Sequence, residues 1–151
     1  MSLLEGLRTG RHPATGAAAE VAAALDDFHD AAAKADAKRY FGRFAPEGVF
    51  LGTDPEERWT LPEFRKLFGP RFGGRSAWIY VPQSRRIALQ GGAFATFDEV
   101  LGNARYGVCR GTGALRKIEG EWKLIQYNLS IPIPNALAPE FVDRIRGASK
   151  K

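Results

Sequence analysis

The feature that most restricts the possible folds is a long stretch of strand-like sequence that follows a helical N-terminal half. The stretch divides at short turns into segments that are typical of β-strands, at residues 76–89, 93–101, 106–118 and 121–131. Short connections of this kind join antiparallel neighbours, so the segments predict a β-meander. Helices first and strands afterwards indicate an α+β domain and not a doubly wound parallel sheet.

The N-terminal half carries signals for helices and one short strand. Thr15 can cap a helix that runs to about Ala35. Apolar residues recur along one side of this helix at spacings of four and three, at Val21, Leu25, Phe28 and Ala32. Asp36 can begin a second helix over residues 37–44, which Pro46 ends, and residues 48–52 read as a short apolar strand.

A third helix has the clearest boundary in the sequence. Residues 60–63, Thr-Leu-Pro-Glu, form a capping box in which Glu63 reaches back to the backbone of Thr60. Phe64, Leu67 and Phe68 then supply the buried face of the predicted helix. Further along, Pro82 predicts an edge position or a bulge in the first long strand, because proline cannot donate to a sheet ladder.

A chain of 151 residues is long enough for one domain with its own core and too short for two comfortable ones. We expect an N-terminal arm over residues 1–16, one domain over 17–135, and a basic tail over 136–151 that is helical or disordered. Three helices cannot cover both faces of four long strands. The sheet is therefore expected to curl around the helices and to expose a convex face that mediates a homodimer.

Composition narrows the classes of partner. No apolar run approaches the roughly 18 residues that a membrane span needs. No signal peptide is recognisable, so the expected location is cytoplasmic, and the single cysteine, Cys109, fits a reducing compartment. Basic residues gather in segments 65–86 and 144–151, whose partners the sequence leaves open. No nucleic-acid motif accompanies them, and no residue spacing predicts a metal site or a cofactor.

The order of the elements and several local stretches of sequence resemble a known family. The stretches that carry the resemblance are residues 25–50, 52–59, 97–101 and above all 120–130, Gly-Glu-Trp-Lys-Leu-Ile-Gln-Tyr-Asn-Leu-Ser. The chain resembles the SnoaL-like branch of the nuclear transport factor 2-like superfamily. This resemblance implies three N-terminal helices packed in the concave face of a curved, mostly antiparallel sheet, which forms a cone with a pocket at its open end.

The same resemblance implies a range of activities, since relatives include isomerases, dehydratases, polyketide cyclases and proteins that only bind or associate. In this branch the last strand often carries a histidine where this sequence has Asn128. An amide can orient a ligand but cannot shuttle a proton near neutral pH. Asn128 therefore favours binding over acid–base chemistry.

Alternation along the strands gives candidate ligand-binding residues. In the last strand every second side chain shares a face, which would place Gln126, Asn128 and Ser130 together at the mouth of a pocket. Alternatively, these polar groups satisfy neighbouring strands or a dimer contact. Three further candidates for ligand contact come from other elements, namely Tyr40, Trp59 and Arg110.

Asp98 is the candidate general base, because a carboxylate enclosed by aromatic groups has a raised pKa. Alternation puts Asp98 and Glu99 on opposite faces, and the sequence does not decide which of them faces the pocket. A pair between Asp98 and Arg110 is the competing structural interpretation. His29 lies among Asp26, Asp27 and Asp30, and we expect it on a solvated helix face.

Three hypotheses for the function follow. The first is a small-molecule-binding domain for an apolar or aromatic ligand with one polar end. The second is a cofactor-independent isomerase, dehydratase or cyclase in which Asp98 is the base and Arg110, Asn128 or Tyr40 polarises a carbonyl. The third is an association module that dimerises through its sheet. The sequence does not name the ligand.

Overall fold

The structure is a computed structural model that describes residues 16–73 and 78–149. Its strands form one six-stranded sheet in the order β2-β1-β6-β5-β4-β3. The α-helices are α2 (Ala17–Ala33), α3 (Ala37–Gly42), α4 (Leu61–Phe68) and α5 (Ala138–Ala148). The strands are β1 (Phe44–Leu51), β2 (Arg58–Thr60), β3 (Val81–Gln90), β4 (Phe94–Asn103), β5 (Gly107–Ile118) and β6 (Glu121–Ser130).

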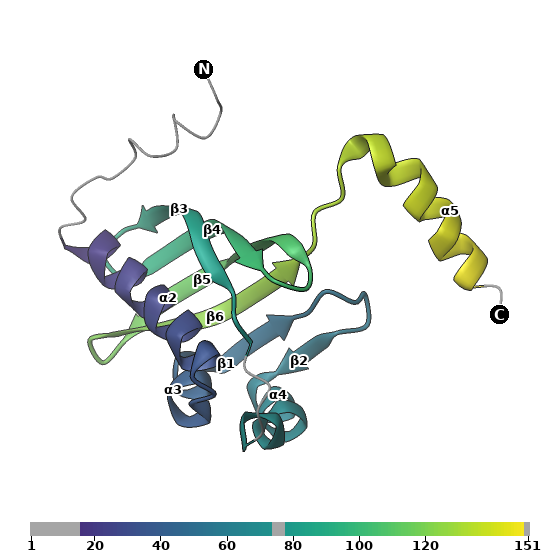
Figure 1. Ribbon diagram of the computed structural model, residues 1–151. Helices are drawn as coiled ribbons and strands as arrows, with labels where there is room; N and C mark the ends of the chain where they lie inside the picture. The colour runs from purple at the N-terminus through teal and green to yellow at the C-terminus, as the bar shows by residue number, and fades with distance from the viewer. Residues whose placement is uncertain (1–15, 74–77, 150–151) are drawn as a thin grey trace.

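The sheet is mixed but mostly antiparallel, because β1 runs parallel to β6 and every other neighbouring pair is antiparallel. In Figure 1 the sheet curves, and α2, α3 and α4 lie on its concave side. Helix α2 packs against β3 and β6, and α4 packs against β1 and β2. This arrangement confirms the α+β fold class and the helices in the concave face.

The first two helices end slightly earlier than the sequence pattern indicates. Helix α2 ends at Ala33, and its predicted cap, Thr15, lies outside the described residues. Helix α3 ends at Gly42, so the prediction that it continues to Phe44 is wrong. Phe44 already belongs to β1, where it lies beside Leu124 of β6. Long-range pairing has outweighed the local helical pattern at this point.

The capping box at the start of α4 is confirmed. The backbone N–H of Thr60 donates to Glu63 Oε2 at 2.8 Å, and the Thr60 hydroxyl donates to the same oxygen at 2.9 Å. Phe64 is buried on the inner side of the helix, but Leu67 is 53% exposed, so its predicted burial is wrong. Trp59 lies in β2, which the sequence did not predict, and pairs with Phe50 of β1.

The meander of long strands is present, and β3 lies at its edge. The pairing of β3 with β4 shifts register between Pro82 and Ser84, which confirms the predicted bulge at this proline. Strand β3 begins at Val81, later than the predicted residue 76. Residues 76 and 77 lie outside the described residues, and residues 78–80 are not in a strand.

Strand β6 contains a bulge that decides which of its side chains face the helices. Ala114 of β5 pairs with Gln126, but the next residue, Leu115, pairs with Leu124. Ile125 is therefore an extra residue without a partner in the β5 ladder. A bulge of this kind breaks the alternation of a strand, because two successive side chains then point to the same side. Leu124 and Tyr127 face the core, and Ile125 and Gln126 do not.

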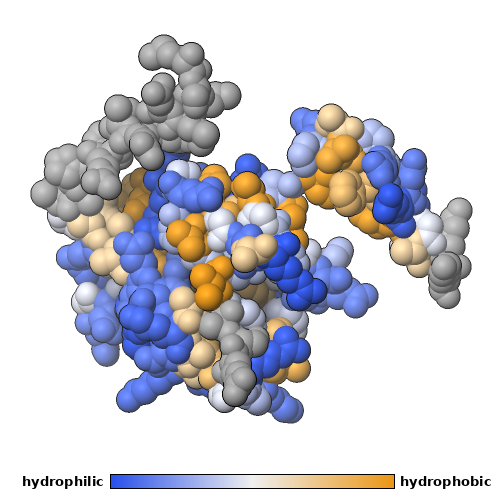
Figure 2. All heavy atoms as spheres, in the orientation of Figure 1, coloured by the Kyte–Doolittle hydropathy of each residue, from blue (hydrophilic) through white to orange (hydrophobic). Residues whose placement is uncertain are grey.

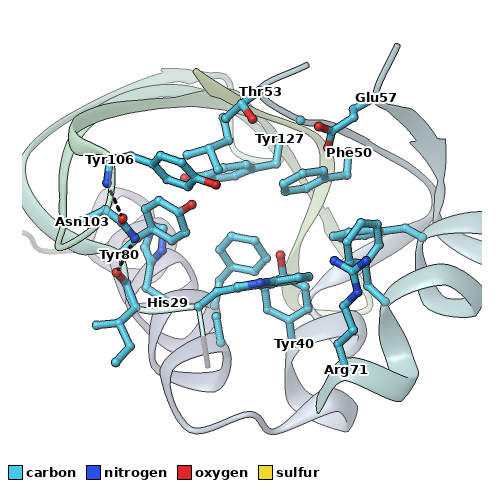
Figure 3. Close-up of a pocket in the computed structure, with 18 of the residues that line it drawn as sticks. His29, Tyr40, Phe50, Thr53, Glu57, Arg71, Tyr80, Asn103, Tyr106 and Tyr127 are labelled. Atoms are coloured by element: carbon cyan, nitrogen blue, oxygen red, sulfur yellow. Dashed lines mark hydrogen bonds between the residues drawn. The ribbon is translucent and has the colours of Figure 1, made fainter. Parts of the chain in front are cut away.

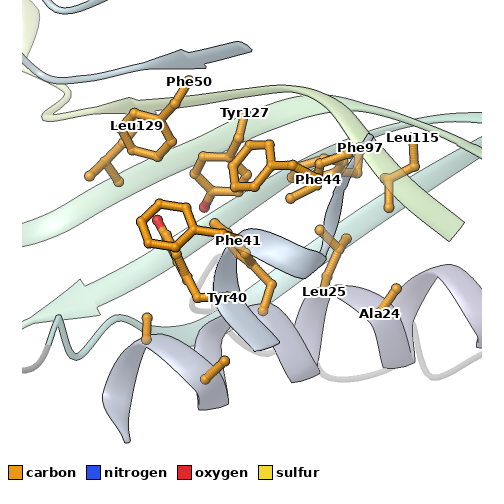
Figure 4. Close-up of a cluster of buried hydrophobic side chains, with 14 of the residues drawn as sticks. Ala24, Leu25, Tyr40, Phe41, Phe44, Phe50, Phe97, Leu115, Tyr127 and Leu129 are labelled. Atoms are coloured by element: carbon orange, nitrogen blue, oxygen red, sulfur yellow. The ribbon is translucent and has the colours of Figure 1, made fainter. Parts of the chain in front are cut away.

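The core lies between the concave face of the sheet and helices α2, α3 and α4, and aromatic rings fill much of it (Figure 4). Leu25 of α2 and Leu115 of β5 are fully buried at one end of this core. Towards the other end, Tyr40 and Phe41 of α3 pack against Phe64 of α4, which stacks on Phe50 of the sheet. Rings at this end leave space between them, and this space is where the candidate site lies.

Helix α5 projects away from the rest of the domain in Figure 1 and buries none of its residues. Its exposed apolar side chains form the hydrophobic patch that Figure 2 shows on the projecting helix, at Phe141, Val142 and Ile145. No described helix combines the length and apolarity that crossing a membrane requires. Most of the predicted N-terminal arm lies outside the described residues, and the predicted domain limits stay predictions.

Candidate functional site

A cavity of about 650 Å³ opens between the helices and the sheet (Figure 3). Helices α2, α3 and α4 supply one wall, and β1, β2 and β6 supply the opposite one. Its inner part is mainly aromatic, with Phe28, Phe50, Trp59, Phe64, Phe68 and Trp78. Polar side chains from the connections between the elements and from the end of β4 lie around the mouth, at Thr53, Glu57, Arg71, Asn103 and Arg105.

Several of the lining rings are nearly parallel to one another. The Phe64 ring lies at 2° to Trp59 and at 4° to Trp78, with centroids 5.9 and 6.3 Å apart. The Phe50 ring stacks on Phe64 with centroids 4.4 Å apart. Parallel faces present flat apolar surfaces, and a planar aromatic molecule gains most contact with surfaces of this shape.

Two of the predicted ligand-binding residues, Tyr40 and Trp59, line this cavity. In Figure 3 the hydroxyl of Tyr40 points into the cavity. It makes no hydrogen bond to any residue of the described ranges 16–73 and 78–149. Burial raises the pKa of Tyr40 well above its usual value, so the group stays protonated and keeps an O–H to donate.

Asp98 and Arg110 do not reach the cavity. Both side chains are exposed on the convex face of the sheet. The proposed role of Asp98 as a base requires an inward-facing side chain, and this expectation is wrong. They are not direct cross-strand partners either, because Asp98 lies opposite Thr112 and Arg110 lies opposite Val100. The inward carboxylate is that of Glu99, the next residue along β4, which is 1% exposed.

The bulge at Ile125 moves the predicted polar row of β6 away from the cavity. Trp122 and Leu124 face inward as expected, but beyond the bulge the inward residues are Tyr127 and Leu129. The expectation of a pocket floor is therefore wrong for the three polar residues of this strand, which are exposed or half-buried on the other face, Gln126, Asn128 and Ser130. The identity of residue 128 thus has no direct bearing on the chemistry inside the cavity.

A buried polar cluster that the sequence reasoning missed lies at the cavity wall. His29 Nε2 is 2.6 Å from Glu99 Oε1, and the Tyr127 hydroxyl donates to the same oxygen at 2.8 Å. The other carboxylate oxygen accepts from Arg85 Nε at 2.8 Å. His29 is 7% exposed, and both it and Tyr127 line the cavity, whereas Glu99 lies behind them.

The charge of this cluster is settled by its hydrogen bonds. Burial by itself raises the pKa of Glu99, but the hydrogen bonds and charges of His29, Arg85 and Tyr127 outweigh it and hold that pKa below its usual value. An ionised carboxylate can only accept, so His29 Nε2 carries the proton in this pair. Its other ring nitrogen, Nδ1, makes no hydrogen bond to any residue that the structure describes.

The backbone beside the cluster is shaped to admit it. A Cβ atom at Gly111 would overlap with the hydroxyl oxygen of Tyr127 and lie 3.0 Å from Glu99 Cγ. Only glycine leaves room at this position for the tyrosine hydroxyl to meet the carboxylate. Gly111 thus supports the cluster through close packing.

One sequence signal could have placed His29 inside. It follows Phe28 and lies four residues after Leu25, so the helical period puts it on the same apolar side as these residues. Asp27 and Asp30 suggested a solvated face, but both form ion pairs with Arg39 of α3. The Arg39 guanidinium lies 2.6 Å from Asp27 Oδ1 and 2.8 Å from Asp30 Oδ2. In the described part of the chain, no group of three or more metal-ligating side chains comes together.

The helices in the concave face of the curved sheet and the cavity between them define a nuclear transport factor 2-like protein. Within that class, the chain belongs to the SnoaL-like domain family, whose model matches residues 21–134. No curated protein sequence is significantly similar to the chain.

Solved structures with the same fold come from several bacteria. A protein of unknown function with a cystatin-like fold from Nostoc punctiforme is 21% identical, with a TM-score of 0.62 over 76% of this chain and 90% of that chain. A protein from Xanthomonas campestris, proposed to be a calcium/calmodulin-dependent protein kinase II association domain, is 25% identical, with a TM-score of 0.61 over 82% of this chain and 92% of that one.

A third similar structure comes from Streptomyces avermitilis and is of a protein proposed to be a dehydratase of the nuclear transport factor 2-like family. It is 14% identical, with a TM-score of 0.64 over 77% of this chain and 96% of that chain. At this level of identity the likeness establishes the shared fold.

Proposed function

We propose that the domain binds a small, mainly apolar and aromatic molecule in the cavity between its helices and its sheet. The observation that carries the proposal is the cavity itself, with a volume of about 650 Å³ and a lining that includes nearly parallel aromatic rings. Ligand sites are typically concave and mainly apolar, with a few polar groups that fix orientation. Tyr40 and His29 are the polar groups of the inner part, where they suit a carbonyl or hydroxyl of the ligand.

The binding proposal is tested with the neutral fluorescent dye N-phenylnaphthylamine. We expect saturable binding of one dye per chain. Ala32 is buried and lines the cavity, so Ala32→Leu puts added methyl groups into the space that the dye needs. This variant should bind the dye roughly tenfold more weakly, which corresponds to about 1.4 kcal/mol.

The matched control is Ala88→Leu, the same substitution at an exposed position of β3. It should bind the dye as the unaltered chain does, and circular dichroism should show both variants folded. Absence of saturable binding to the unaltered chain, or equal affinity in both variants, would show that the cavity does not take up ligands.

A second candidate function is proton transfer by side chains, in an isomerase, dehydratase or cyclase. The hydrogen bond between His29 and the ionised Glu99 favours it, because such a pair fixes the tautomer and the orientation of the imidazole. The base in this proposal is His29 and not Asp98. The similarity to a protein proposed to be a dehydratase is consistent with it.

The reaction that we propose for these groups is abstraction of a proton next to a carbonyl group. His29 Nδ1 takes the proton of the C–H bond, and the electron pair of that bond moves towards the carbonyl oxygen. The O–H of Tyr40 donates a hydrogen bond to the negative charge that develops there. Return of the proton from His29 to the same molecule, at another atom, completes an isomerisation or releases a leaving group.

This activity is measured as exchange of deuterium from heavy water into ligands that carry a C–H bond next to a carbonyl. We expect His29→Gln to slow the exchange by at least about 10²-fold, the usual contribution of a positioned base. Glutamine can still donate to Glu99, so the cluster keeps a hydrogen bond. Asp98→Asn on the convex face should leave the rate unchanged; the reverse pattern would restore Asp98 as the base.

The predicted homodimer through the convex sheet face stays a prediction. That face carries charged side chains, among them Arg86, Asp98 and Arg110, beside half-buried ones such as Val100 and Thr112. Association through it is compatible with an open cavity, because the cavity lies on the other side of the sheet.

A further inference from the structure

The mouth of the cavity carries two arginines, and they come from separate loops. Arg71 lies in the 3₁₀ helix Gly69–Gly73, which follows α4, and Arg105 lies in the turn between β4 and β5. Both residues line the cavity and are also exposed, which places their positive charges at its open end. The aromatic inner part supplies no comparable charge.

An aromatic ring supports Arg71. The guanidinium carbon of Arg71 lies 4.7 Å from the centroid of the Phe68 ring, which also lines the cavity. Stacking on a ring holds the guanidinium plane while its N–H groups remain at the ring's edge, where they can donate. Figure 3 shows the Arg71 side chain extending upward beside the cavity, on the side where Glu57 and Phe50 lie.

The turn that carries Arg105 is fixed by a side chain. The amide oxygen of Asn103 accepts from the backbone N–H groups of Arg105 and Tyr106, both at 2.9 Å. The amide nitrogen of Asn103 donates to the carbonyl oxygen of Ile79 at 3.1 Å, which ties the turn to the segment before β3. The guanidinium carbon of Arg105 lies 5.3 Å from the Tyr106 ring. The turn is therefore held in one conformation before any ligand arrives.

The acidic residue at the mouth, Glu57, does not neutralise these arginines. Its carboxylate folds back over Gly52 and accepts from the backbone N–H of Asp54 at 3.3 Å. Within residues 16–73 and 78–149, neither Arg71 nor Arg105 has a carboxylate oxygen within 4.0 Å. Two guanidinium groups at the mouth are thus available to an anion, and a carboxylate matches the paired N–H groups of arginine.

We infer that the ligand is an aromatic carboxylate, whose ring lies against the aromatic lining of the cavity and whose carboxylate lies at the mouth, where Arg71 and Arg105 supply positive charge. This inference rests on the proposed binding function and specifies the class of ligand. It also assigns a role to Arg71 within the basic segment 65–86, for which the sequence gave no partner.

Two dyes of similar shape test the inference: anilinonaphthalene sulfonate, whose anionic group stands in for the carboxylate, and the neutral N-phenylnaphthylamine. We expect Arg71→Gln and Arg105→Gln each to weaken binding of the anionic dye by about tenfold, since charge-assisted hydrogen bonds contribute roughly 1.5–3 kcal/mol. The affinity for the neutral dye should change by less than about twofold. Arg110→Gln on the convex face is the control and should alter neither affinity.

The outcomes separate the two proposals. If neither dye binds to the unaltered chain, the binding function and this inference both fail. If both dyes bind but the two mouth variants leave the ratio of their affinities unchanged, the cavity binds ligands and the inference of an anionic ligand is overturned. A larger loss for the neutral dye than for the anionic one would also overturn it, because the arginines would then act through shape and not charge.

Discussion

Replacing Glu99 with glutamine is expected to lower the free energy of unfolding by about 3–5 kcal/mol, the usual cost of breaking a buried ion pair from one side. The carboxylate accepts hydrogen bonds from three side chains, His29, Arg85 and Tyr127. Without it, the guanidinium of Arg85 loses its inner counter-charge, and the amide cannot satisfy the three donors together. Urea unfolding followed by circular dichroism measures the loss.

The neighbouring residue provides a matched control for this experiment. Asp98 lies on the same strand but points to the convex face, where it is exposed. Asp98→Asn should therefore change the free energy of unfolding by no more than about 0.5 kcal/mol. Equal losses for the two variants would mean that Glu99 is not the buried member of the pair.

At acid pH, the difference in the free energy of unfolding between Glu99→Gln and the unaltered chain should become smaller. Because the folded-state pKa of Glu99 is lowered, its contribution is fully present above the unfolded pKa of about 4.3 and is lost as the pH falls through the folded-state pKa. The two unfolding free energies should therefore converge below about pH 4. A gap that stays constant down to pH 2 would show that the ionised carboxylate is not what stabilises the fold.

The second large effect is expected at Phe64, which is 1% exposed and lies where α4 meets the sheet. Its ring contacts rings from α3, β1 and β2, including Tyr40, Phe50 and Trp59. Phe64→Ala should cost about 3–5 kcal/mol, because the removed ring leaves a void that its neighbours fill only in part. The same substitution enlarges the ligand cavity, so the affinity for the neutral dye should fall as well.

Leu67 serves as the control, since it lies three residues further along the same helix and is 53% exposed. Leu67→Ala should cost less than about 1 kcal/mol, because alanine favours helix and little apolar contact is lost. If Leu67→Ala lowered the free energy of unfolding much more than Phe64→Ala did, Leu67 and not Phe64 would be the buried residue of α4.

The parts of the fold that could be predicted from the sequence are those with local causes. The capping box at Thr60 depends on two residues of one turn, and the meander depends on turns that lie between its strands. Phe97 and Leu101 flank Glu99 at alternate positions, so their size alone favoured Glu99 over Asp98 as the inward acid.

The polar residues of β6 could not be placed in this way. Alternation assumes one residue of β6 for each residue of β5, and the bulge at Ile125 breaks that count. Nothing in the local pattern marks Ile125 as the extra residue, because the bulge is defined by pairing with β5. His29 was missed for a related reason, since the carboxylate that it meets lies 70 residues away in the sequence.

The bulge also has a consequence for how cavities of this fold diversify. Because Ile125 bulges out of the β5 ladder, the end of β6 presents Tyr127 and Leu129 to the cavity. The amide side chains of Gln126 and Asn128 lie on the other face. If the same residues paired regularly, without a bulge at Ile125, the strand would present Gln126, Asn128 and Ser130 to the cavity instead. The gain or loss of a one-residue bulge can therefore exchange an aromatic lining for a polar one without a change in any of the residues that form the lining.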